Sequence, residues 1–160
     1  MQLPIQIRSC GGCTECCGGW LEGQIHDHVL KPGSPCKYKL DTGCGIYDRR
    51  PEHPCKTYLC QWSFDSSIPE WMKPDKVKVI CTTHKIDRYV ILELRECGQP
   101  MPIEVLHWMF IMFIDRKILN VRYQVNGLWY YLSHEKDLDK EIDAQMAEWP
   151  NATDCKPVKS

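Results

Sequence analysis

The residues with the clearest capacity for chemistry in this chain are its cysteines. The chain has 160 residues and 11 of them are Cys. Eight precede Trp62: Cys10, Cys13, Cys16, Cys17, Cys36, Cys44, Cys55 and Cys60. Thiolates are soft ligands that hold zinc or iron–sulfur clusters, commonly four to a centre. The eight cysteines therefore predict a metal-binding region, with two four-cysteine sites or with one such site and four further thiols.

The first four of these cysteines lie close together in the sequence. Cys10, Cys13 and Cys16 follow the spacing CxxCxxC, and Cys17 comes directly after the last of them. Two cysteines separated by two residues can place both sulfurs on one ion, and the glycine pairs around them allow the backbone to curl tightly. Adjacent side chains tend to diverge, so one of Cys16 and Cys17 serves a second metal, bridges two sites, or remains a thiol.

The remaining four cysteines lie in a segment with an excess of positive charge. A metal ion bound by four thiolates is negatively charged overall and requires nearby donors and cations. Between Cys36 and Cys60 the basic residues Lys37, Lys39, Arg49, Arg50 and Lys56 outnumber the acidic residues Asp41, Asp48 and Glu52. This excess suits a thiolate site, although a solvated surface would also show it.

The compartment and the class of partner follow from what the sequence lacks. No N-terminal segment has the pattern of a secretion signal, and this favours a cytoplasmic protein with reduced thiols over a disulfide scaffold. The odd number of cysteines favours the same interpretation. The apolar run 103–114 is too short to span a membrane. A formal net charge of -1 gives no electrostatic reason to expect nucleic acid or an anionic membrane as partner.

Histidines are the competing ligands. His26 and His28 lie within the cysteine-rich segment, and His53 lies two residues before Cys55, so any of them could replace a thiolate because neutral imidazole suits zinc. His107 lies on an apolar segment and is interpreted as a core residue.

The three cysteines after Trp62 have a different context. Cys81 lies in a predicted strand and Cys97 just after one, so both are expected to be small buried apolar residues. Cys155 lies in a polar tail and is interpreted as incidental.

The positioning elements are expected to differ between the two halves of the chain. Residues 1–65 form a Cys-rich metal-binding region that is rich in Gly and Pro and cannot build an apolar core unaided. Residues 66–76, with two prolines, are interpreted as a connector. Residues 77–160 are expected to form an α+β region, packed as one unit with the first.

Within the second half, alternating β-branched and aromatic residues predict strands at 77–82 and 89–94, with a turn region between them. The apolar run after Pro102 predicts a buried helix that ends near Lys117. Asn126-Gly127 predicts a two-residue hairpin turn, and 135–149 an amphipathic helix. The predicted order is β-β-α-β-β-α, with a small antiparallel sheet and two helices.

One part of the sequence resembles a known family. The segments CTECCGG and PCKYKLDTGCGIYDRRPEHPCKTYLCQW are similar to the cysteine-cluster family described as a putative zinc- or iron-chelating CxxCxxCC domain. The matching positions are Cys13, Cys16, Cys17, Cys36, Gly43, Cys44, Ile46, Tyr47, Arg50, Pro51, Cys55, Cys60 and Trp62. The resemblance covers about a third of the chain and implies metal chelation, with zinc and iron both open. A related arrangement accompanies a flagellin lysine methylase, where an iron–sulfur cluster is implied.

Two classes of function are consistent with these features. In the first, zinc at one or two sites is structural, and the protein serves an interaction or assembly role with a protein partner. In the second, the chain carries a [4Fe-4S] cluster and acts as an electron carrier or as an accessory oxidoreductase. No dinucleotide fingerprint, nucleophile elbow or phosphate loop is present, so an enzyme is the less favoured interpretation and no catalytic residue is assigned.

Overall fold

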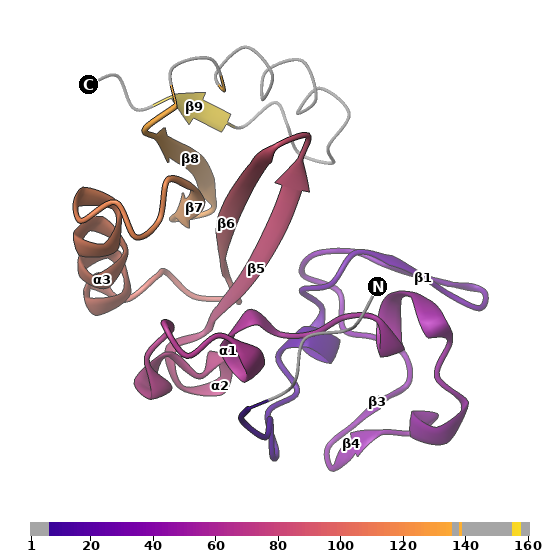
Figure 1. Ribbon diagram of the computed structural model, residues 1–160. Helices are drawn as coiled ribbons and strands as arrows, with labels where there is room; N and C mark the ends of the chain where they lie inside the picture. Colours follow the sequence, from indigo (N-terminus) through magenta and orange to yellow (C-terminus); the bar gives the residue numbers. More distant parts are fainter. Residues whose placement is uncertain (1–6, 136–137, 139–154, 158–160) are drawn as a thin grey trace. The chain divides into compact units, whose positions relative to one another are not determined.

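The computed structural model describes residues 7–135, 138 and 155–157. The chain divides into two compact units, Met1–Ile80 and Cys81–Ser160 (Figure 1). The segment 66–76, expected to be a connector, belongs to the first unit. Its Met72 is fully buried, which is the behaviour of a core residue and not of a linker.

The first unit consists of short elements joined by turns. Two small hairpins pair β1 (Gly23–Ile25) with β2 (His28–Leu30) and β3 (Lys39–Leu40) with β4 (Gly43–Cys44). Helices of three to five residues cover Cys16–Gly18, Tyr47–Arg49, Glu52–Lys56 and Glu70–Met72, and α1 (Gln61–Phe64) and α2 (Pro74–Val77) have four residues each. Elements of this length gain little from backbone cooperativity alone, so other contacts must hold them.

Two small clusters provide those contacts. Ile25, Leu30 and Cys36 form a buried cluster against which Leu21, Tyr38, Ile46 and Cys55 pack. Elsewhere in this unit, the Arg8 guanidinium lies 5.2 Å from the centre of the Trp62 ring, and its Nη1 donates to the carbonyls of Trp62 at 2.9 Å and Ile68 at 2.8 Å. The first cluster contains two of the predicted metal ligands, so it lies directly at the cysteine site.

The second unit is built on one sheet in the order β5-β6-β7-β8-β9. The strands are β5 (Val79–Ile86), which begins at the unit boundary, β6 (Tyr89–Glu96), β7 (Asn120–Val125), β8 (Leu128–Ser133) and β9 (Cys155–Pro157). The helix α3 (Ile103–Ile114) connects β6 to β7 and lies beside the sheet (Figure 1). The α+β class is therefore confirmed, and the predicted hairpin turn at Asn126-Gly127 joins β7 to β8, with both residues at positive φ.

Two details of the predicted fold are wrong. β6 and β7 pair in parallel, with Glu93 opposite Arg122, so the sheet is mixed and not antiparallel. The physical reason is that the intervening helix returns the chain to the end of the sheet where β6 began. The first strand also continues to Ile86, through residues assigned to a turn region.

The helix α3 differs from its prediction as well. It ends at Ile114, and Val105 and Met109 are its buried residues, whereas Ile103 and Ile114 are 71% and 72% exposed. His107, interpreted as a core residue, is exposed. A helix lying on one face of a sheet buries only a stripe, and this segment has more apolar residues than one stripe holds. The helix predicted at 135–149 falls largely outside the described residues.

The interior of the second unit contains charged groups. Glu93 accepts a hydrogen bond from Arg122 at 3.0 Å and lies 3.3 Å from Arg95 and 3.4 Å from His84. Glu93 and Arg122 are each only 4% exposed. Nearby, Glu96 accepts hydrogen bonds from three backbone N–H groups, including those of the Asn126-Gly127 turn. These two carboxylates of β6 thus bind β6 to β7 and to the turn of the hairpin that β7 begins.

The described helices include none that is long and apolar enough to cross a membrane.

Candidate metal centre

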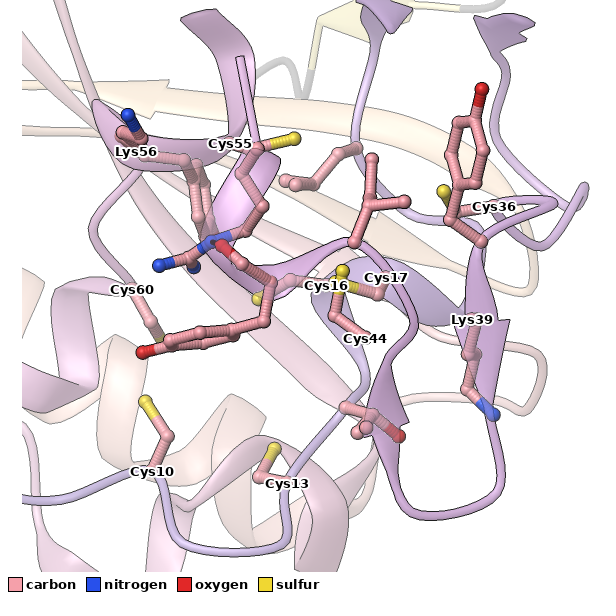
Figure 2. Close-up of a pocket in the computed structure, with 18 of the residues that line it drawn as sticks. Cys10, Cys13, Cys16, Cys17, Cys36, Lys39, Cys44, Cys55, Lys56 and Cys60 are labelled. Atoms are coloured by element: carbon pink, nitrogen blue, oxygen red, sulfur yellow. Dashed lines mark hydrogen bonds between the residues drawn. The ribbon is translucent and has the colours of Figure 1, made fainter. Parts of the chain in front are cut away.

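The eight cysteines before Trp62 meet at one place in the first unit. They line a single cavity of ≈ 750 Å³, shown in Figure 2. All eight are thiols and not disulfides. They come from segments as far apart in sequence as Cys10 and Cys60, so tertiary structure is what brings them together. Cys81 and Cys97 lie elsewhere and are buried, 1% and 5% exposed, as predicted.

Local backbone structure positions the N-terminal cysteines. The Cys13 N–H donates to the Cys10 carbonyl at 3.0 Å, which closes the first CxxC turn. Cys16 and Cys17 begin the one-turn helix Cys16–Gly18, and Gly19 follows at a φ of 111°. The Cys36 N–H then donates to the Cys17 carbonyl at 3.1 Å. This last bond ties the Cys10–Cys17 loop to the segment that carries the later cysteines.

The thiols fall into two groups, and within each group the thiols alter one another's pKa. The first thiol group is Cys10, Cys13, Cys16 and Cys60. The side chains of Cys16 and Cys60 are hydrogen bonded to each other, which raises the pKa of Cys16 well above 9.0 and lowers that of Cys60 to about 7. Burial raises the pKa of Cys10, and the charges of Cys60 and Cys13 raise it further.

The second thiol group is Cys17, Cys36, Cys44 and Cys55. Burial raises the pKa of Cys17 to about 11, and the charges of Cys44, Cys36 and Cys55 add to the effect. Burial likewise raises the pKa of Cys55, followed by the charges of Cys36 and Cys44. In Figure 2, Cys10 and Cys13 lie on one side of the cavity and Cys36 on the other, with Cys16 and Cys17 between them. Each of the two adjacent cysteines thus belongs to a different group.

Basic side chains at the cavity offset a part of the rise in thiol pKa that burial causes. Lys39, Arg50 and Lys56 line the cavity, and Arg50 lowers the pKa of both Cys17 and Cys55 against the effect of burial. Among the described residues, no histidine and no carboxylate lines the cavity. The alternative ligands His26, His28 and His53 are thus not brought to it. His53 instead lies with Nδ1 3.1 Å from the Thr57 hydroxyl.

One residue of this site, Tyr58, is not indicated by the sequence pattern. The Tyr58 side chain lines the cavity with Cys16 and lowers the pKa of that thiol. A tyrosine two residues before Cys60 carries no signal of this role in the sequence, because the contact depends on how the 55–60 segment folds back.

The thiols are near one another without forming a finished coordination sphere. Within the described part of the chain, no group of three or more His, Cys, Asp or Glu side chains is arranged to hold a metal ion. An ion entering the cavity would have to draw the sulfurs inward. Rotation of cysteine side chains and adjustment of the glycine-rich loops are the movements that such convergence requires.

The loop at Gly19 provides a test of how tightly this site is built. A Cβ at Gly19 would lie 2.6 Å from the Ser34 carbonyl carbon, at a φ that side chains rarely adopt. We expect Gly19→Ala to destabilise the first unit by about 2 kcal/mol or more, because the clash is with backbone. Gly33→Ala is the matched control, since Gly33 also has positive φ but lies in open space. Equal losses in a denaturant titration would contradict the role of the close approach.

No protein-family model, curated protein or solved structure matches this chain.

Proposed function

We propose that the first unit binds metal through its cysteine thiolates and that the metal is mainly structural, with zinc as the ion. The observation that carries this proposal is that all eight cysteines before Trp62 line one cavity. Thiols spread over 50 residues would not be expected to meet by chance in a unit with so little apolar core. A metal supplies the folding free energy that short elements and a small core do not.

The chemistry of the donors supports the same proposal. Thiols such as the eight that line this cavity are suited to zinc or to an iron–sulfur cluster and poorly suited to hard ions such as magnesium or calcium. Burial and mutual repulsion work against keeping several of these cysteines ionised together, and a bound cation reverses this balance. The basic groups of Lys39, Arg50 and Lys56 would compensate the remaining negative charge.

A structural zinc site leaves the protein to act through its surfaces, so the proposal includes an interaction or assembly role with a protein partner. A fully thiolate zinc site has no open position and is a poor activator of water, which disfavours a zinc hydrolase. The second candidate is a [4Fe-4S] cluster in an electron carrier or accessory oxidoreductase. The eight thiols that line the cavity are the observation that supports this candidate.

Metal analysis of protein purified without oxygen tests the proposal. We expect a colourless protein that contains about two zinc ions per chain. A brown protein that contains iron and sulfide would reject the zinc proposal in favour of the iron–sulfur cluster. Protein without stoichiometric metal would contradict both candidates.

Matched substitutions test the ligands. We expect Cys17→Ser and Cys60→Ser each to lower the metal content by about one ion per chain, because each removes a ligand from a different thiol group. Cys97→Ser is the control. Its thiol is buried outside the cavity and lies 3.7 Å from the Arg95 carbonyl, a contact that serine can also make. Loss of metal in Cys97→Ser alone would place the site elsewhere.

A further inference from the structure

The two thiol groups are nested in chain order. Reading from the N-terminus, three members of the first group come first, all four members of the second group follow, and Cys60 of the first group comes last. The second group therefore lies wholly inside the loop that runs from Cys16 to Cys60. At the start of this loop the two groups are consecutive residues, Cys16 and Cys17, within one helical turn.

The geometry points to two nested four-thiolate zinc sites, one per thiol group, in which an ion at either site increases the affinity of the other by closing its loop. This inference rests on the proposed metal-binding function and adds to it the division of the ligands and the coupling between sites. It is carried by the shared cavity, by the position of Cys16 and Cys17 between Cys10 and Cys13 on one side and Cys36 on the other (Figure 2), and by the backbone hydrogen bond that joins Cys36 to Cys17.

The physical origin of the coupling is loop closure. In a chain without metal, bringing Cys16 to Cys60 closes a loop of about 44 residues, at an entropic cost that grows with its length. When an ion at the second site already holds Cys17 and Cys55 together, the remaining path is about six residues. Closure probability falls with the three-halves power of length, so the coupling is about 20-fold. By thermodynamic linkage, an ion at the first site increases the affinity of the second site by the same factor.

Coupled sites fill together. With about 20-fold coupling and equal intrinsic affinities, chains carrying one ion would be roughly a fifth of the population at half-saturation, compared with half for independent sites. The first unit would thus pass between metal-free and fully loaded forms with little of the intermediate. A folding unit controlled in this way responds sharply to the concentration of free zinc.

The coupling is measured by titrating the metal-free, reduced full-length chain with zinc in a competing chelator and counting bound ions by native mass spectrometry. Cys10→Ser/Cys13→Ser isolates the second site, and Cys36→Ser/Cys44→Ser isolates the first. We expect the two-ion binding constant of the unmodified chain to exceed the product of the two single-site constants by about 20-fold. A ratio near one would overturn the inference while leaving metal binding intact.

Two insertions of eight Gly/Ser residues provide a second measurement that needs no ligand substitutions. Inserted after the exposed Thr57, the linker lengthens the path between the sites and should reduce the coupling to about 7-fold. Inserted after the exposed Asp41, it lengthens only the outer loop and should leave the coupling at about 25-fold. The Thr57 variant should therefore show more one-ion chains at half-saturation. Equal fractions in both variants would overturn the inference, whereas failure of every chain to bind zinc would instead reject the proposed function.

Discussion

Removal of metal with a strong chelator is expected to unfold the Cys-rich part of the first unit while the sheet of the second unit stays folded. The apparent free energy of a structural zinc site is about 10–16 kcal/mol, which is as large as the stability of a whole ordinary domain, about 5–15 kcal/mol. In the first unit the described elements are at most four or five residues long up to α2, and the buried cluster at the cysteines is small. Without metal, little remains to offset the chain entropy of this segment.

Limited proteolysis and hydrogen exchange measure this outcome directly. After chelation we expect new cleavage between Cys10 and Cys60 and fast exchange of the amides in β1 to β4, with β6 and β7 still protected. Restoring zinc under reducing conditions should restore protection, and magnesium should not, because thiolates are poor ligands for a hard ion. Unchanged cleavage and exchange after verified metal loss would contradict a structural role for the metal.

The second large effect is expected at Glu93. Substitution by glutamine removes the negative charge between Arg122, Arg95 and His84, and the buried Arg122, only 4% exposed, loses its ion pair with Glu93. Breaking a buried ion pair in this way destabilises a protein by about 3–5 kcal/mol. We expect that loss in the free energy of opening of β6 and β7, measured by hydrogen exchange.

Two controls separate the buried charge from a general effect of mutation. Glu104→Gln changes an exposed carboxylate on α3 and should alter stability by less than about 0.5 kcal/mol. The double substitution Glu93→Leu with Arg122→Met should recover part of the loss, because apolar side chains can replace a buried pair at little cost. If Glu93→Gln exchanged no faster than Glu104→Gln, the network would not stabilise the sheet.

The same carboxylate should make the second unit sensitive to acid. Burial alone would raise the pKa of Glu93, but the close contact with His84 and the charges of Arg95 and Arg122 lower it below 4.5. A lowered pKa means that stability is fully present above the ordinary value and is lost as the pH falls through the folded-state value. We expect the stability of β6 and β7 to decline below about pH 4.5, with a shallower decline in Glu93→Gln.

The sequence by itself predicted the parts that depend on local chemistry. The eight candidate ligands, the hairpin at Asn126-Gly127, the strand character of residues around Cys81 and the burial of Cys81 and Cys97 all follow from residue types and short-range patterns. A turn needs particular residues at particular places, and strands alternate on a fixed period, so neighbouring residues carry enough information.

Tertiary structure alone decided the features that join distant residues. The sequence left open whether one of Cys16 and Cys17 serves a second metal, bridges two sites or remains a thiol. It also left three histidines as alternative ligands. The fold places the two cysteines beside different partners, Cys60 for one and Cys36, Cys44 and Cys55 for the other, and leaves the histidines off the cavity. It also made β6 parallel to β7, placing Glu93 opposite Arg122. These outcomes depend on how loops close and strands pair across the chain, and spacing along the sequence does not specify either.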